Sequence, residues 1–404
     1  MPRKILVSAF FVYFSLFTSI MCVPPMEHII REELLLTHAE TGMLFAIPFL
    51  MLVGLAIPAG RTADLIGVRK SAGIGIVILA VGSMLKSTST DASSLFIFTF
   101  ICGAGFGWIF PTLPKFVSTW ISRERSGRTT GILVSGLAAG SAMAMALTMP
   151  FIYPVTGTFQ GAFFIWSILP AVAAILWWTL VREPLEYGID NRSATKNPAQ
   201  IFSLLRNKNL WLIAALLFLN EFFIMTWFGW SPSLLILKGA KPDIAGLISS
   251  ITVWVSIPAA FFMTRAAYKM GVRRPFLWIP SIILAFAAWG AIHMNLTISW
   301  LIMALVGVAE VTRFATVLAL PVDIMSKRQV GIASGLVMSI GYAGGFIGPW
   351  ITGRIMDITK NFDISLLILV GISIASVGIA FKIPETGAKA STYERVNLRT
   401  ETGN

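Results

Sequence analysis

The chain is poor in charged residues, cysteine and histidine, and each shortage excludes a class of protein. Asp, Glu, Lys and Arg make up only 12% of its 404 residues, whereas hydrophobic residues make up 56%. A soluble domain carries roughly 25% charged residues, so this composition excludes a water-soluble globular fold. The mean hydropathy of +0.79 instead indicates a protein that crosses the membrane many times.

The few cysteines and histidines form no pattern of ligands. Cys22 and Cys102 fall within apolar runs, where a thiol behaves as a small packing residue. His28, His38 and His293 are scattered without ligand spacing. We therefore expect no disulfide framework, no metal site and no cofactor. The sequence also contains no P-loop and no catalytic Ser, His or Cys constellation, so an enzyme is not expected.

Long apolar runs are what the chain has in abundance. A helix needs about 20 mostly apolar residues to span the hydrocarbon core, and twelve runs reach this length. They cover residues 5–23, 42–62, 71–89, 94–121, 129–151, 159–181, 209–235, 244–266, 275–295, 298–322, 330–355 and 363–383. The expected fold is an all-α membrane protein with twelve transmembrane helices.

One basic segment occurs twice. GRTADLIGVRK, residues 60–70, returns 204 residues later as TRAAYKMGVRR, and each copy follows a long apolar run. The same offset aligns residues 122–131 with residues 326–335, so one half is a diverged copy of the other. The repeat predicts two six-helix bundles, residues 1–181 and 209–383. The polar segment 182–208 is the expected cytoplasmic linker, and the tail 384–404 is expected to be a flexible cytoplasmic extension.

The net charge of +12 is divided unevenly between the two sets of loops. The loops after the second, fourth, eighth and tenth runs hold Arg61, Arg69, Lys70, Arg123, Arg125, Arg128, Arg265, Lys269, Arg273, Arg274, Lys327 and Arg328. The opposite loops hold only Arg31, Lys86, Lys238, Lys241, Arg354 and Lys360. Because basic loops stay in the cytoplasm, we expect both termini there and the protein in the plasma or inner membrane. The charge is thus topological, and no nucleic-acid partner is expected.

The first copy of the basic segment fits the pattern Gly-x-x-x-Asp-x-x-Gly-x-Arg-Lys. It resembles the signature loop of the major facilitator superfamily, between helices two and three. The resemblance implies two six-helix bundles around a central cavity that opens alternately to each side. In the second copy Tyr268 replaces Asp64 and Thr264 replaces Gly60, so any role of that carboxylate is expected in the first half alone.

Physical chemistry suggests a conformational lock at this loop. Gly60 and Gly67 allow close approach and a tight reversal. Asp64 is expected to accept hydrogen bonds from a facing helix N-terminus and to pair with Arg69. With Lys70 and Arg128 this cluster would hold the two bundles together on the cytoplasmic side. The alternative is that the basic residues only obey the positive-inside rule.

Residues 111–140 and the C-terminal half are loosely similar to the cyanate and nitrate/nitrite branch of the superfamily and to neighbouring organic-anion carriers. Drug/proton antiporters usually carry a Gly-Pro pair in helix five. This chain has Gly136-x-x-x-Gly140 there without that pair. Multidrug efflux is therefore the less favoured interpretation.

Three charged residues lie near the middle of apolar runs, and therefore near the bilayer centre: Glu221, Glu310 and Arg313. A charge at the bilayer centre costs at least about 2.5 kcal/mol, so each needs a reason. Glu310 and Arg313 are three residues apart on one helix and can neutralise each other, which is the structural interpretation. In the functional interpretation Arg313 binds an anionic substrate, while Glu310 or Glu221 takes and releases a proton.

Five further residues are candidates for the site. Lys115 either extends its amine to the membrane interface or contacts an anion in the cavity. Asn220, Tyr13, Trp108 and Trp227 are candidate cavity-lining residues, although Trp and Tyr are also common at membrane interfaces.

The function expected is secondary active transport of a small anionic solute by alternating access, coupled to protons or to a counter-substrate. The alternative is export of lipophilic compounds or drugs by proton antiport. A non-transporting membrane receptor is the third possibility, and the partners expected are the solute, the proton or counter-substrate, and the lipid bilayer.

Overall fold

A computed structural model describes residues 3–121, 123–182, 205–325 and 329–387, which form helices and short connections without a strand. Twelve helices or helix pairs are long and apolar enough to cross a membrane, which confirms the predicted class. Most of the predicted linker 182–208 and most of the tail 384–404 lie outside the described residues.

The first six spans form one bundle, and shorter helices extend some of them. Its long helices are α1 (Arg3–Met21), α3 (His38–Ile66), α4 (Val68–Lys86), α5 (Ala92–Ile109), α7 (Arg123–Leu147) and α9 (Phe159–Leu180). Its short segments are η1 (Pro24–Met26), α2 (Glu27–Glu33), η2 (Phe110–Thr112), α6 (Leu113–Trp120), η3 (Thr148–Ile152) and α8 (Tyr153–Thr156). The second bundle contains α11 (Lys208–Leu237), α12 (Pro242–Met270), α13 (Pro275–His293), α14 (Leu296–Ile324), α15 (Val330–Thr359) and α16 (Phe362–Lys382).

Two of the predicted spans differ from the structure in extent. The first continues through η1 and α2 to Glu33. The side chain of Glu27, the first residue of α2, is buried. The fourth, predicted as one run over 94–121, is interrupted by η2. Pro111 and Pro114 lie at this break, and proline cannot donate the hydrogen bond that a continuous helix requires.

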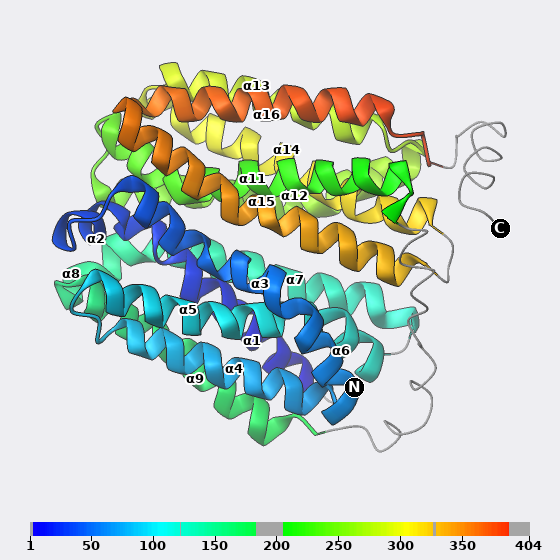
Figure 1. Ribbon diagram of the computed structural model, residues 1–404, viewed down its shortest axis with the longest axis horizontal. Coiled ribbons are helices and arrows are strands. Elements are labelled where there is room, and N and C mark those ends of the chain that lie inside the picture. The colour runs from blue at the N-terminus through cyan, green and yellow to red at the C-terminus, as the bar shows by residue number, and fades with distance from the viewer. Residues whose placement is uncertain (1–2, 122, 183–204, 326–328, 388–404) are drawn as a thin grey trace.

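The two bundles lie side by side along the length of the molecule, with α3 and α15 where they meet (Figure 1). The first residues of α1 and the last residues of α16 lie at the same end of the molecule. We call this the terminal end, and the opposite end, which carries α2 and α8, the α2 end. Both copies of the repeated basic segment lie at the terminal end.

A lysine closes a helix end in each bundle, although the two lysines are not at equivalent positions of the repeat. At the α2 end Lys86 of α4 donates to the carbonyl of Ser19 in α1, 2.7 Å away, and Lys238, just after α11, donates to the carbonyl of Ile292 in α13. Cations are favourable beside the last carbonyls of a helix. Lys86 was grouped with the loop residues on sequence, but only 3% of it is exposed. It is a buried structural contact.

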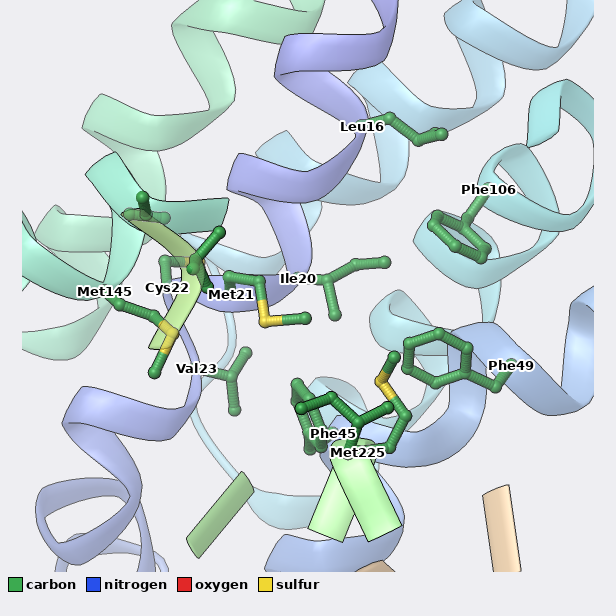
Figure 2. Close-up of a cluster of buried hydrophobic side chains, with 14 of the residues drawn as sticks. Leu16, Ile20, Met21, Cys22, Val23, Phe45, Phe49, Phe106, Met145 and Met225 are labelled. Atoms are coloured by element: carbon green, nitrogen blue, oxygen red, sulfur yellow. The ribbon is translucent and has the colours of Figure 1, made fainter. Parts of the chain in front are cut away.

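Apolar packing joins the bundles through the middle of the molecule. Phe45 and Phe49 of α3 and Met225 of α11 belong to one continuous cluster of buried side chains, and Figure 2 shows Met225 beside the two rings. The ring of Phe106, from α5, packs edge-on against Phe49 at 5.5 Å. The long helices are therefore held by side chains from both halves of the chain.

The contact between bundles is uneven along the molecule. Near the α2 end a Cβ atom on Gly42 would lie within 3 Å of the backbone of Pro349, and one on Gly353 would lie as close to the backbone of His38. Near the terminal end a Cβ atom on Gly131 or Gly335 would meet nothing within 4 Å. A second buried cluster there contains only residues of the C-terminal bundle. Among the described glycines, those that pack on the backbone of the other bundle lie towards the α2 end, and none at the terminal end makes such a contact.

Candidate functional site: a buried charge cluster in the C-terminal bundle

The side chain of Arg313 is fully enclosed by the C-terminal bundle. It has 0% exposure and is the largest of the fully buried side chains described. Its Nε donates to Oδ1 of Asn220 on α11 at 2.8 Å, and NH1 lies 3.4 Å from Oγ of Ser281 on α13. The guanidinium also lies 5.8 Å from the ring centre of Phe223, within range of a cation–π interaction.

Asn220 connects the arginine to a carboxylate. The amide accepts from Arg313 and donates through Nδ2 to Oε1 of Glu310, 3.3 Å away. No Arg313–carboxylate pair within 4.0 Å occurs in the described part of the chain. Glu310 and Arg313 interact electrostatically, as the structural interpretation predicts, but they form no direct ion pair because Asn220 lies between them.

Two polar atoms of this cluster have no hydrogen-bond partner. They are NH2 of Arg313 and Oε2 of Glu221, whose side chain is only 2% exposed. Leaving a buried charged group without a partner is costly. The cluster therefore keeps one free donor and one free acceptor.

The local sequence explains how these groups meet. Asn220 and Phe223 are three residues apart on α11, as are Glu310 and Arg313 on α14, so each pair shares a helix face. Ser281 supplies a small side chain on α13 where a large guanidinium must fit. Sequence reasoning missed Ser281, since a single serine in an apolar run gives no signal of its own.

A second residue missed from the sequence is Tyr342 of α15. Its side chain is 5% exposed and close enough to Glu221 and Glu310 to interact electrostatically with both. Its ring packs edge-on against Phe110 of the N-terminal bundle at 5.4 Å. The charged cluster is thus adjacent to the contact between the two bundles.

The remaining candidate cavity residues make no described direct contact with Arg313. Trp227 borders a cavity of about 10 Å³ between α11 and α16, which is room for about one water molecule. Tyr13 of α1 is buried and interacts with Thr112 of η2. Trp108 donates to Oγ of Ser71 on α4 at 3.2 Å, so it faces a neighbouring helix of its own bundle. Among the described contacts, neither Tyr13 nor Trp108 reaches Arg313, whereas Trp227 stacks at 6.0 Å on Phe223, the ring beside the guanidinium.

Lys115 belongs to the basic loop. Its Nζ donates to Oδ1 of Asp64 at 2.6 Å and to the carbonyl of Gly60. The expected pairing of Asp64 with Arg69 was wrong, because Arg69 instead donates to the carbonyls of Val181 and Trp178 at the end of α9. Neither expectation for Lys115 anticipated this ion pair. The contacts described for these side chains stay within the N-terminal bundle.

Other parts of the predicted lock behave differently. Gly67 has φ of 90°, so the tight reversal between α3 and α4 requires glycine, as predicted. A Cβ atom on Gly60 would meet only Nζ of Lys115, at 3.9 Å, so no close helix approach occurs there. Lys70 is exposed. Arg128 lies in α7, and its side chain is outside the described part of the structure.

At the second copy of the loop a different carboxylate forms the ion pair. Tyr268 and Ala319 occupy the positions equivalent to Asp64 and Lys115, so that ion pair has no counterpart. Instead Arg273 pairs with Asp323 at 3.0 Å. Arg274 donates to the carbonyl of Ile383, much as Arg69 does to that of Val181.

Twelve spans in two bundles, with a charged cluster beside the contact between them, define a polytopic membrane protein built for transport. The family model described as the Major Facilitator Superfamily matches residues 9–349, with a second match over residues 236–396. The chain belongs to that superfamily, and its function is transport rather than catalysis.

Three curated relatives span most of the chain. It is 25% identical to an uncharacterized transporter, YycB, of Bacillus subtilis, covering 89% of this chain and 88% of the relative. It is 23% identical to a hexuronate transporter of the same organism, covering 90% of each. It is 22% identical to the cyanate transport protein CynX of Escherichia coli, covering 84% of this chain and 86% of the relative. The resemblance to cyanate and organic-anion carriers is confirmed.

A solved structure shares the fold. The inward-facing, unoccupied form of a bacterial homologue of the human lysosomal transporter Spinster superposes with a TM-score of 0.78 at 13% identity, covering 99% of both chains. The two-bundle architecture expected from the repeat is therefore that of known transporters. Among the described residues, no three His, Cys, Asp or Glu side chains are grouped as metal ligands would be.

Proposed function

We propose that this transporter moves a small anion by alternating access, with Arg313 as the cation that binds it and Glu310 or Glu221 as the proton-carrying group. The observation that carries the proposal is the free NH2 donor of Arg313, inside the C-terminal bundle and fully buried. A guanidinium presents paired donors that match a carboxylate or a similar oxyanion.

Energetics supports a functional role for this arginine. Burying a cation among helices is expensive unless a partner neutralises it. Asn220, Ser281 and Phe223 supply dipoles and a ring face but no opposite charge in direct contact. Glu310 and Glu221 interact with the guanidinium electrostatically, and an anion that binds at NH2 would add an opposite charge in direct contact with the free donor. The hexuronate and cyanate named for two relatives are both anions.

The two carboxylates support coupling to protons. Glu221 has an unpartnered buried oxygen, and Glu310 is held only through the amide of Asn220. Movement of Arg313 toward a substrate would break or strain its bond to Asn220 and so change the surroundings of Glu310. We infer that substrate occupancy and protonation are linked through this amide.

The proposed orientation has the terminal end in the cytoplasm. The basic residues Arg61, Arg69, Lys70, Arg273 and Arg274 lie at that end, in agreement with the positive-inside rule. The membrane is then the plasma or inner membrane, and the α2 end, where the close backbone contacts between the bundles lie, faces away from the cytoplasm. Single cysteines would be placed in loops at the terminal end and at the α2 end of the protein. Their labelling from outside right-side-out vesicles tests this orientation.

Ligand binding tests the anion assignment. The purified protein would be melted in detergent with a panel of cyanate, nitrite, hexuronates, other small organic acids and lipophilic cations. A ligand that binds only the folded state raises stability by RT ln(1 + [L]/Kd), so millimolar binders are visible at high concentration. We expect one anion class to raise the Tm of the wild type but not of Arg313→Lys. A shift by lipophilic cations alone, equal in both proteins, would overturn the proposal in favour of the export alternative.

A further inference from the structure

We propose that Asp357 and Glu27 form a latch between the two bundles at the α2 end, which holds the molecule closed there and open at the terminal end. The proposal rests on the alternating-access function proposed above. It concerns carboxylates remote from the charged cluster, and nothing in their sequence context marks them as functional.

Asp357, in the last turns of α15, caps a helix of the other bundle. Its Oδ1 accepts from the backbone N–H of His38 at 2.9 Å and its Oδ2 from that of Ala39 at 2.8 Å. Nδ1 of His38 lies 2.9 Å from the same Oδ1. One carboxylate of the C-terminal bundle thus makes three contacts with the start of α3.

The first turn of α3 depends on this carboxylate. A helix leaves its first N–H groups without partners inside the helix. The side chain of Thr37 accepts a hydrogen bond from the backbone N–H of Glu40 in a capping box. The backbone N–H groups of His38 and Ala39 donate instead to Asp357. A carboxylate is also favourable beside the positive end of the helix dipole. Separation of the bundles at this end would therefore remove the native partner of two backbone donors.

Glu27 makes the second connection. It is 5% exposed, and within its own bundle its Oε1 accepts from Arg31 and Thr41, each at 3.1 Å. Its Oε2 accepts from Oγ of Ser233 on α11, in the other bundle, at 2.7 Å. The carboxylate is thus held in place by its own bundle and directed at the other.

The surrounding contacts place both carboxylates in one seam. Gly353 lies one turn before Asp357 and packs directly on the backbone of His38. Trp230 contacts the position of Gly42 and donates to Oγ1 of Thr352 at 3.0 Å. Among the described residues, the hydrogen bonds between the two bundles are those of Asp357 and Glu27. The polar connection is therefore confined to the end that is closed.

Distance measurements on the full chain test the latch. Spin labels would be placed at Val155 and Leu237, one per bundle at the α2 end, in a background with Cys22→Ala and Cys102→Ala. A second pair at Leu65 and Tyr268 reports the terminal end. All four positions are at least 67% exposed. Double electron–electron resonance, without substrate, gives the populations of the closed and open forms at each end.

We expect Asp357→Asn to raise the population with a longer Val155–Leu237 distance by about tenfold relative to the closed form, because a charged hydrogen-bond acceptor is lost. The Leu65–Tyr268 distance should shorten in the same molecules. Ser233→Ala, which removes only one donor, should shift both populations less in the same direction. Asp363→Asn removes a carboxylate at the same end that makes no described contact with the other bundle, and should leave both distributions unchanged.

Unchanged distributions in both Asp357→Asn and the double variant Asp357→Asn with Glu27→Gln, in protein that remains monodisperse, would overturn the latch. Transport is assayed separately in proteoliposomes. Transport without a distance shift refutes the latch alone. A distance shift in a protein that moves no anion refutes the proposed function alone.

Discussion

Arg313 donates from Nε to Oδ1 of Asn220 at 2.8 Å, and both side chains are completely buried. The bond crosses from α14 to α11 and fixes the orientation of the amide. The opposite side of that amide then has only donors to offer, and it is directed at Glu310. This one contact therefore arranges the whole charged cluster.

Replacing Asn220 with alanine should destabilise the protein by about 1 to 3 kcal/mol, because Arg313 and Glu310 would both lose a hydrogen-bond partner in a buried site. The measurement is the Tm of the purified variant. Ser256→Ala, which removes only a bond to Val253 within the same helix, serves as control. An equal Tm for both variants would show that the amide is dispensable.

Arg313→Lys should reduce anion transport at least about tenfold, because an ammonium cannot contact Asn220 and an anion together as the guanidinium fork does. The measurement is initial uptake into proteoliposomes. Arg354→Lys, an exposed position near the α2 end, should transport normally. Normal uptake by Arg313→Lys would exclude the arginine as the anion-binding group.

Glu310→Gln or Glu221→Gln should abolish stimulation of transport by a proton gradient while retaining exchange of internal for external substrate. A glutamine keeps the shape of the side chain but cannot release a proton. Uptake with and without an imposed pH gradient measures the stimulation, and counterflow measures the exchange. Gradient stimulation that persists in both single variants would show that coupling uses another group.

Asp64→Asn should slow transport without preventing membrane insertion, and Lys115→Gln should have the same effect. The pair is half exposed, with side-chain exposures of 54% and 32%, so its loss should cost at most about 1 kcal/mol of stability. The double variant should be no slower than either single variant, since the two residues act through one ion pair. Additive losses in transport rate would mean that each residue has a separate partner during the cycle.

Gly42→Ala should open the α2 end, whereas Gly54→Ala on the same helix should not. A Cβ atom on Gly42 would clash with the carbonyl of Pro349 in the other bundle, while one on Gly54 would meet nothing within 4 Å. The measurement is the rate at which a single cysteine introduced at the α2 end is labelled, and this rate should be higher only in Gly42→Ala. Equal labelling of both variants would show that the seam can adjust to the extra methyl group.

The sequence predicted the class of fold because hydropathy and repeats depend on the order of residues alone. The boundaries of most spans were predicted to within a few residues, and the reversal at Gly67 followed from the type of residue. The broken fourth span was missed, although Pro111 and Pro114 were visible, because either proline is tolerated inside a membrane helix.

The sequence also determined which charged residues needed an explanation. Glu221, Glu310 and Arg313 stand out in apolar runs whatever the fold, and Asn220 was a candidate beside them. The hydrogen-bond partners of these residues could not be predicted from the apolar runs. These helices are apolar on nearly every side, so the hydrophobic pattern does not fix their rotation about the helix axis.

Only the tertiary structure decided which side chains contact one another. Asn220 lies between Arg313 and Glu310, Lys115 pairs with Asp64, and Asp357 accepts hydrogen bonds from the first turn of α3. Asp357 and His38 are 319 residues apart in the chain. Such contacts depend on how two bundles pack, and packing is set by the shapes of many side chains together rather than by any local stretch of sequence.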